Sequence, residues 1–204
     1  MSDETTTASK KRGGERKAAI LQALALMLEQ GSGDKVTTAG LARAVGVSEA
    51  ALYRHFPSKA KMYDALFDFV EESLFSRITL ILKQPTHAPQ KCRQIGELTL
   101  QFADRNPGLC RLLTGDVLVG EHERLGQRSA KIMARLETQI KQLLREAEAT
   151  EGLRTHQPIA VCANHMVAFI AGKILSYVRS TFAQNPVENL DLHWELLATG
   201  IFRN

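Results

Sequence analysis

The sequence predicts an all-α fold of about nine helices. Apolar residues recur at spacings of three and four over most of the chain, and no segment shows the alternation typical of a strand. The chain has 204 residues, of which 44% are hydrophobic and 24% charged. This composition is that of a soluble globular protein and excludes a wholly disordered or fibrous chain.

The first helix is expected to begin near Ile20. Residues 1–14 are polar and charged without apolar periodicity, and they predict a mobile basic tail. From Ile20 onward apolar residues recur at helical spacing until two glycines, Gly31 and Gly33, end the helix.

Eight further helices follow, each separated from the next by cap or turn residues. Thr37 or Thr38 is expected to cap the second helix and Ser48 the third, because their side-chain oxygens accept hydrogen bonds from helix N–H groups. Pro57-Ser58 then ends the third helix and begins the fourth. The expected helices after the first cover residues 37–44, 48–56, 59–83, 90–104, a short segment through Leu113, 121–149, 158–182 and 190–202.

The segment from Thr37 to Lys61 has the pattern of a helix-turn-helix. Two short helices are joined by Val45-Gly46-Val47, and Gly46 suits the tight turn because glycine tolerates positive φ. The second helix is expected to be locked against the first by the apolar side chains of Leu41, Val45, Val47, Leu52 and Phe56. Its other face is left outward, where it can enter the major groove of DNA.

The candidate DNA-binding residues lie on this outward face, in the turn or at a helix start. Hydroxyl and N–H groups at a helix N-terminus suit phosphates, as do Tyr53, His55 and Lys59. The side chains at 48–51 can approach base edges or thymine methyl groups. A solvated three-helix unit that never touches DNA is the alternative interpretation. The full set is Thr37, Thr38, Gly46, Ser48, Glu49, Ala50, Ala51, Tyr53, Arg54, His55 and Lys59.

The charge is concentrated in the same part of the chain. Residues 1–61 hold 10 basic and 6 acidic side chains, whereas residues 62–204 hold 16 of each, so the whole net charge of +4 lies in the first third. Between Lys10 and Lys61 the balance is 10 against 4, or +6. A basic N-terminal unit on a neutral body indicates an anionic partner.

Catalytic and metal chemistry are weakly indicated. Cys162-x-x-His165 lacks a second ligand cluster at suitable spacing, and no nucleophile elbow or phosphate-binding glycine loop is present. We therefore expect no catalytic residues, no metal and no cofactor. Three widely spaced cysteines (Cys92, Cys110 and Cys162) argue against a disulfide framework.

No uninterrupted apolar run approaches the ~18 residues of a membrane span, and the polar N-terminus lacks the apolar stretch of a signal peptide. These features predict a cytoplasmic protein in a reducing compartment, without a membrane partner.

The run SEAALYRHFPSK, from Ser48 to Lys59, resembles the hallmark of the TetR family, Ser-x-x-x-Leu-Tyr-x-His-Phe-x-Ser-Lys. The resemblance extends from Ile20 to Ile201, and the run RNPGLCRLL at 105–113 is similar to the subfamily of nucleoid occlusion factors. It implies a nucleoid-associated homodimer that binds palindromic DNA, with one or several dimers per site. It also implies that the DNA-bound protein binds FtsZ and blocks assembly of the division ring over the chromosome.

The resemblance further implies a set of FtsZ-facing residues: Phe69, Arg77, Leu98, Arg105 and Asn106. Without it, Phe69 would be interpreted as core and Arg77 as a solvated side chain. The chain departs from the family pattern at Gln101, where a familiar member has glycine, and in the loop at 84–91, which holds two prolines and a histidine.

These observations divide the chain into a basic tail at 1–14, a helix-turn-helix domain at 15–57 and a helical body for dimerisation and partner binding at 58–204. The segment 159–177 is rich in small residues and is expected to form the dimer interface with 190–202, which includes Trp194; a helix packed only within the chain is the alternative. A ligand-responsive transcriptional repressor of the same family remains the alternative function, and it requires a cavity in the body.

Overall fold

The computed structural model describes residues 3–31, 36–118 and 123–203, and the side chains of the first helix from Gly14 onward. These ranges contain nine helices, which confirms the predicted all-α class, and a single β-bridge that joins Thr155 to Phe202. The helices are α1 (Asp3–Gln30), α2 (Thr38–Val45), α3 (Glu49–His55), α4 (Lys59–Leu82), α5 (Ala88–Arg105), α6 (Pro107–Leu113), α7 (Glu123–Thr150), α8 (Ile159–Arg179) and α9 (Leu190–Ile201).

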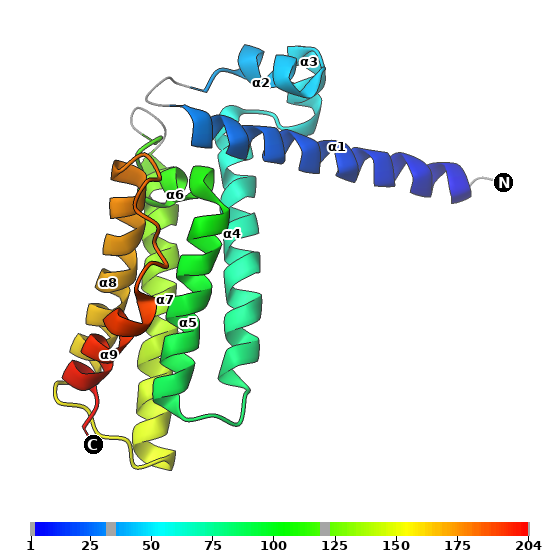
Figure 1. The fold of residues 1–204 in the computed structure, drawn as a ribbon. Helices are drawn as coiled ribbons and strands as arrows, with labels where there is room; N and C mark the ends of the chain where they lie inside the picture. The colour runs from blue at the N-terminus through cyan, green and yellow to red at the C-terminus, as the bar shows by residue number, and fades with distance from the viewer. Residues whose placement is uncertain (1–2, 32–35, 119–122, 204) are drawn as a thin grey trace.

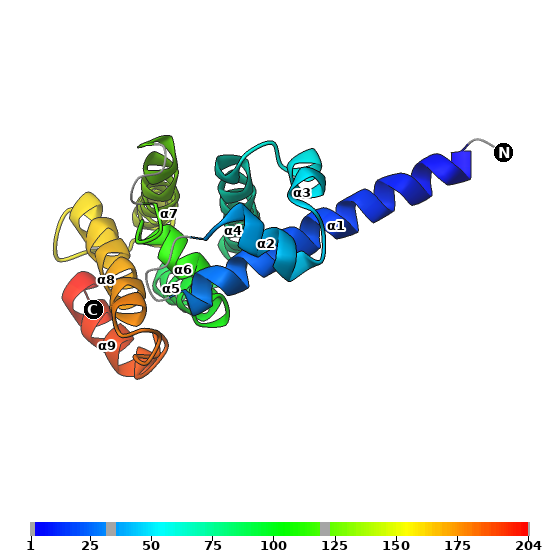
Figure 2. The same cartoon turned by 90° about the horizontal axis from the view of Figure 1, so that it is seen from above.

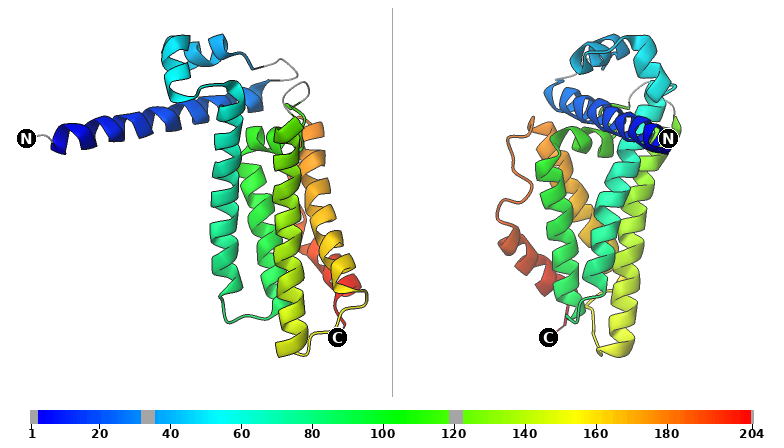
Figure 3. Two further views of the ribbon diagram at one scale, coloured as in Figure 1. Left: turned by 180° about the vertical axis from the view of Figure 1, so that it is seen from behind. Right: turned by 90° about the vertical axis from the view of Figure 1, so that its right-hand side faces the viewer.

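The molecule consists of a small N-terminal module at one end of a helical body. Figure 1 shows α1 lying across the end of the body, with α2 and α3 on its outer side. The long helices α4, α5, α7 and α8 run along the body, the short α6 lies beneath α1, and α9 packs on the outside near the opposite end (Figures 1 and 3). Helix α4 begins at the module and continues down the body, so it belongs to both.

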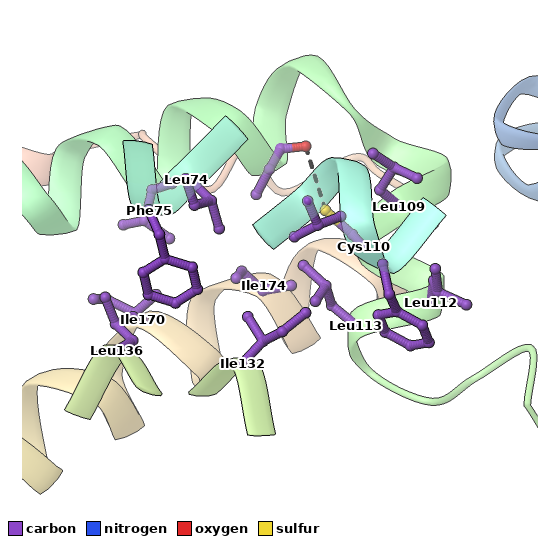
Figure 4. Packing of buried hydrophobic residues seen from close by; sticks show 14 of the residues in the cluster. Leu74, Phe75, Leu109, Cys110, Leu112, Leu113, Ile132, Leu136, Ile170 and Ile174 are labelled. Atoms are coloured by element: carbon purple, nitrogen blue, oxygen red, sulfur yellow. Dashed lines mark hydrogen bonds between the residues drawn. The ribbon is translucent and has the colours of Figure 1, made fainter. Parts of the chain in front are cut away.

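A continuous cluster of buried apolar side chains joins the helices of the body. Figure 4 shows this core where α6 meets the other helices: Leu113 of α6 lies near Ile132 of α7 and Ile174 of α8, whereas Leu109 lies on another side of α6. All four side chains are buried. Because the core reaches from α6 to α4, α7 and α8, the body is packed up to the surface on which α1 rests.

The first helix is longer than predicted. It begins at Asp3 rather than near Ile20, so the expected basic tail at 1–14 is helical over its described part. The segment before Ile20 is rich in Ala, Lys, Arg and Glu, which have high helix propensity. Apolar periodicity reports only which residues a helix buries, and the N-terminal half of α1 projects beyond α3, away from the body (Figure 2).

The other predicted boundaries agree with the structure to within a few residues. The largest difference is at the end of α8, which stops at Arg179 because Thr181 and Phe182 take left-handed backbone conformations with φ of 52° and 65°. The expected helix stop at Gly33 and the expected helix start at Glu121 lie outside the described residues.

Helix α8 carries apolar residues on its exposed side as well as on its buried side. By length and composition it could cross a membrane, with a mean hydropathy of 1.6 over 18 residues, of which 33% are buried. Asn164, His165 and Lys173 interrupt its apolar runs, so no uninterrupted run in the sequence has the length of a membrane span. Within the chain α8 packs on α5, α6 and α7, as the core helix of a helical body does.

Candidate DNA interface and partner groove

The helix-turn-helix is held in shape by two caps and one glycine. The Thr37 hydroxyl accepts a hydrogen bond from Gly40 N at 3.1 Å, and the Ser48 hydroxyl accepts one from Ala51 N at 3.2 Å. Gly46 ends α2 with φ of 69°, and its N–H bonds to carbonyl oxygens of α2. The predicted N-caps and the predicted turn glycine are therefore confirmed.

The motif packs on α1 through the apolar residues that the sequence predicted. Leu41, Leu52 and Phe56 are buried, while Val45 and Val47 are half-buried against the same core. Ile20 of α1 is also fully buried in this core. The three helices therefore form one unit with α3 on its outer side.

The predicted DNA-binding residues lie at the surface, on α3, in the turn before it and at the starts of α2 and α4. Tyr53 is 43% exposed, and the remaining members are exposed or half-buried. The Thr38 hydroxyl donates to the Glu49 carboxylate at 2.9 Å, which links the starts of α2 and α3. Sequence reasoning missed this link, because the two residues are eleven positions apart.

Two lysines border this surface through contacts with aromatic rings. The Lys17 ammonium lies 5.8 Å from the Phe56 ring centre, and the Lys59 ammonium lies 5.4 Å from the ring centre of Tyr63. Lys59 opens α4 and is half-buried. The two basic side chains that border α3 therefore belong to α1 and α4.

An ion network fastens this first part of α4 to α7. Arg124 Nη2 donates to Asp64 Oδ2 at 2.7 Å, and Arg128 Nη1 donates to the Asp64 backbone oxygen at 3.0 Å and to Oδ1 at 3.3 Å. Arg128 Nη2 also donates to Asp68 at 2.7 Å and to Glu71 at 2.8 Å.

Burial alone would raise the pKa of Asp64, but hydrogen bonds from Arg124 and Arg128 and the charges of these arginines outweigh it and lower the pKa below its usual value. Asp64 is therefore a carboxylate at neutral pH. The network was not among the residues singled out from the sequence, since its two sides are about sixty positions apart.

A groove lies between α4 and α5 on the side of the body. It has a volume of about 170 Å³, and all five residues matched to the FtsZ-facing set line it: Phe69, Arg77, Leu98, Arg105 and Asn106. Phe69 is 48% exposed, so the interpretation of this residue as core is wrong. Its ring centre lies 6.4 Å from that of Phe102.

Three further residues line the same groove. Ser73, Gln101 and Phe102 complete its wall, and of these only Gln101 was noted in the sequence. The Asn106 amide donates to the Phe102 backbone oxygen at 2.8 Å, which fixes the end of α5 at one end of the groove. The groove thus presents an aromatic and aliphatic floor between two exposed arginines, Arg77 and Arg105.

The cysteines lie apart from these surfaces. Burial raises the pKa of both Cys92 and Cys110 to about 12, so both thiols stay protonated. Cys162 is buried while His165 is exposed, so the two side chains do not face one site. Over residues 3–31, 36–118 and 123–203 no group of three possible metal ligands comes together.

Comparison with known families assigns both parts of the chain. Residues 20–66 match the family described as bacterial regulatory proteins, tetR family, and residues 88–201 match the tetracyclin repressor-like C-terminal domain of the SlmA-like type. The chain belongs to the TetR family. Its helix-turn-helix is the DNA-binding module of this family.

Relatives within the TetR family match nearly the full length. The chain is 51% identical over 190 residues to the nucleoid occlusion factor SlmA of Marinomonas sp. (strain MWYL1), a match that covers 93% of this chain and 96% of the relative. It is 49% identical over 179 residues to the nucleoid occlusion factor SlmA of Shewanella woodyi, a match that covers 88% of this chain and 91% of that protein.

Solved TetR-type structures share the fold at low sequence identity. The regulator FadR from Bacillus subtilis, in complex with stearoyl-CoA, has a TM-score of 0.76 at 16% identity, covering 90% of this chain and 98% of FadR. FadR from Bacillus halodurans has a TM-score of 0.78 at 14% identity, covering 91% and 95% respectively. These likenesses support the fold alone.

Proposed function

We propose that this protein is a nucleoid occlusion factor: a dimer that binds palindromic chromosomal DNA and, when bound, engages FtsZ and blocks division-ring assembly over the nucleoid. The relatives at about half identity carry that name over nearly the whole chain. One structural observation carries the proposal further. Five residues from α4, α5 and the following turn, matched from sequence to the FtsZ-facing set, line one groove.

On the DNA side, α3 enters the major groove and the helix starts hold phosphates. The hydroxyl groups of Thr37 and Ser48 accept cap hydrogen bonds, so each keeps its own hydrogen for a phosphate oxygen. Tyr53, His55 and Lys59 set the register on the backbone, while residues 48–51 meet base edges. The DNA-binding unit ends at Pro57, and the body from Ser58 onward serves dimerisation and partner binding.

Dimerisation uses the exposed apolar face of α8 and α9. Leu192 and Leu196 are 60% and 74% exposed, and Val161 on α8 is also exposed. Small residues such as Ala168 and Gly172 stand on the exposed side of α8 and allow a second helix to approach closely. A second copy covering this face accounts for the apolar character of α8 on both of its sides.

The groove between α4 and α5 receives FtsZ. Phe69 supplies apolar contact area, and Arg77 and Arg105 supply positive charge at its edges. Such a groove suits a segment that combines apolar and acidic side chains. Gln101 adds an amide to this wall, so the chain has a hydrogen-bonding group there that the glycine of a familiar family member lacks.

Helix α4 connects the two activities. Its first turn holds the phosphate-binding Lys59, and its exposed face carries Phe69 and Arg77 three to five turns further on. The mechanism is therefore binding with coupling between two sites, without a catalytic step. It places the protein on the nucleoid in the cytoplasm.

The cavity in the helical body gives little support to the alternative function, a ligand-responsive repressor. The apolar cavity lined by Cys92, Ile140, Met166 and Trp194 has a volume of about 20 Å³. This is room for about one water molecule, whereas pockets that hold drug-sized ligands measure about 300–1,000 Å³. A drug-sized effector would require this part of the core to open.

The groove is tested by Arg77→Asp, which reverses one charge at its edge. The variant is expected to bind specific DNA as the wild type does and to lose FtsZ binding by at least ~10-fold, since its charge repels an acidic partner. Arg145→Asp, at an exposed position on α7, is the matched control and should leave both unchanged. Equal loss of DNA and FtsZ binding in Arg77→Asp would mean that Arg77 serves the fold.

A further inference from the structure

Helix α4 exposes two large apolar side chains, and both lie on the face that borders the groove. Phe69 is 48% exposed and Leu80 is 64% exposed, whereas the other large apolar side chains of α4 are buried or half-buried. At ~100° per residue, Leu80 lies ~20° around the helix axis from Phe69 and ~60° from Arg77. Because Phe69 and Arg77 line the groove, Leu80 continues the same row of α4 about one turn beyond Arg77.

Helix α5 places Lys91 opposite Leu80. The two helices run antiparallel and are joined by residues 83–87, and the ring centres of Phe69 and Phe102 lie 6.4 Å apart (Figures 1 and 3). Leu80 comes eleven residues after Phe69, and Lys91 comes eleven residues before Phe102. Eleven residues make about three whole turns and ~16 Å of helix, so the second pair repeats the placement of the first nearer the connection.

The pair of Leu80 and Lys91 repeats the chemistry of the groove beyond its end. The groove itself reaches no further than Arg77 on α4 and Leu98 on α5. Beyond it, Leu80 offers apolar area and the half-buried Lys91 offers positive charge, as Phe69 and Arg77 do inside the groove. A single exposed leucine is common on protein surfaces and indicates nothing alone. Leu80 differs because it shares the row of Phe69 and faces a basic residue.

We propose that the surface that binds FtsZ extends beyond the groove to Leu80 and Lys91, where it takes an apolar side chain of the docked segment next to an acidic one. The inference rests on the proposed function of the groove. A segment that contacts both Phe69 and Leu80 spans ~16 Å, which an extended chain covers with about five residues. A partner with only the part of the motif that fills the groove would therefore bind more weakly than FtsZ, since the second pair adds its own contacts.

The first test measures how tightly full-length FtsZ binds the full-length protein, which is held on a sensor through biotinylated specific DNA. Leu80→Ala is expected to lower the affinity by ~5-fold and Lys91→Glu by ~10-fold, because one loses apolar contact and the other repels an acidic side chain. Thr79→Ala is the matched control. Thr79 is the exposed neighbour of Leu80, it points ~100° away around the helix, and its hydroxyl donates to the Phe75 backbone oxygen. It should stay within ~2-fold of the wild type.

The possible results separate this inference from the proposed function. Wild-type affinity in either Leu80→Ala or Lys91→Glu, with a loss in Arg77→Asp, would overturn the inference and leave the groove as the binding site. An equal loss in Thr79→Ala would also overturn it, because the end of α4 would then serve the fold. Wild-type affinity in Arg77→Asp would mean that the proposed function of the groove fails.

A chemical footprint tests the contact without relying on affinity. The three cysteines of the chain, Cys92, Cys110 and Cys162, are buried, so Leu80→Cys provides a single exposed thiol. Its alkylation by iodoacetamide, followed by peptide mass spectrometry on the DNA-bound protein, should slow by at least ~5-fold when FtsZ is added to saturation. The thiol of Ala134→Cys, at an exposed position on α7, should keep its rate. An unchanged rate at position 80 in the complex would contradict the inference.

Discussion

Asp64 is the residue at which α4 is tied most closely to α7. Its side chain is 10% exposed, and Arg124 and Arg128 donate to both of its oxygens. Replacing one carboxylate oxygen by an amide would place an N–H₂ donor against guanidinium donors inside this contact. The cost arises from unmatched hydrogen bonds and from the charge left on the arginines.

We expect Asp64→Asn to lower the free energy of unfolding by about 2 kcal/mol at pH 7. Because the pKa of Asp64 is lower in the folded than in the unfolded state, its contribution is present above pH ~4 and is lost as the pH falls through the folded-state pKa. Urea unfolding at pH 7 and below pH 4 should therefore show the gap to wild type narrowing in acid.

Asp68→Asn is the matched control, since Asp68 binds the same Arg128 but its side chain is 71% exposed. It should cost less than about 1 kcal/mol. Equal effects at the two positions would mean that burial of Asp64 is not what makes this contact matter.

We expect Lys59, in the first turn of α4, to bind phosphate rather than to read sequence. Lys59→Ala should weaken binding to every DNA about equally and reduce the slope of log affinity against log salt by ~1. Titrations by fluorescence anisotropy at several salt concentrations measure both quantities. Lys83→Ala, just past the other end of α4, should change neither; a changed preference between sites in Lys59→Ala would show that Lys59 reads bases.

At the scale of elements, the helix-turn-helix was predictable because its signals are local. Thr37, Gly46 and Ser48 determine where α2 and α3 begin and end through bonds to residues no more than four positions away. The start of α1 was not predictable from periodicity, because the sequence before Ile20 has no apolar periodicity and residues 14–19 are exposed. Helix propensity, rather than amphipathicity, was the available signal.

The basic N-terminal half of α1 should contribute to DNA affinity through charge. Removing residues 2–12 deletes Lys10, Lys11 and Arg12, and it should lower the salt slope by up to ~3 while leaving the melting temperature unchanged, since the core residues of α1 begin at Ile20. Replacing only those three residues by alanine should give the same slope. A slope that stays at the wild-type value would mean that this segment lies away from DNA.

The groove and the α4–α7 ion network could be recognised only from the structure. The periodicity of apolar residues predicted α4 and α5 as separate helices. It carries no information about which of their faces meet when α5 runs back along α4. Phe69 and Arg105 become neighbours only in the folded chain, and the same is true of Asp64 and Arg128. The resemblance named five of the residues that line the groove, whereas nothing in the sequence distinguished the network.

At the scale of the whole molecule, three surfaces occupy different parts of the protein. The DNA-binding face lies on the N-terminal module, the groove lies between α4 and α5, and the exposed apolar face lies on α8 and α9 (Figure 1). Gln101 of the groove and Leu192 of α9 line one surface pocket, so the groove and the apolar face adjoin each other where α9 packs on α5.

The dimer face is tested by Leu196→Glu, at a side chain that is 74% exposed and so contributes little to the fold of the single chain. We expect sedimentation velocity to show a monomer, and affinity for a palindromic site to fall by ~100-fold or more because the two half-sites are then bound separately. Leu80→Glu, at an equally prominent leucine on α4 that is 64% exposed, should remain a dimer. A dimeric Leu196→Glu would place the interface elsewhere.

Sedimentation of FtsZ polymers tests most directly whether DNA binding enables this protein to act on FtsZ. Polymers are pelleted with GTP in the presence of the protein alone, the protein with a selected palindromic DNA, and the Arg77→Asp variant with the same DNA. We expect loss of pelleted polymer only for the wild type with specific DNA. Equal amounts of polymer in all three samples would mean that DNA binding does not direct this protein against FtsZ.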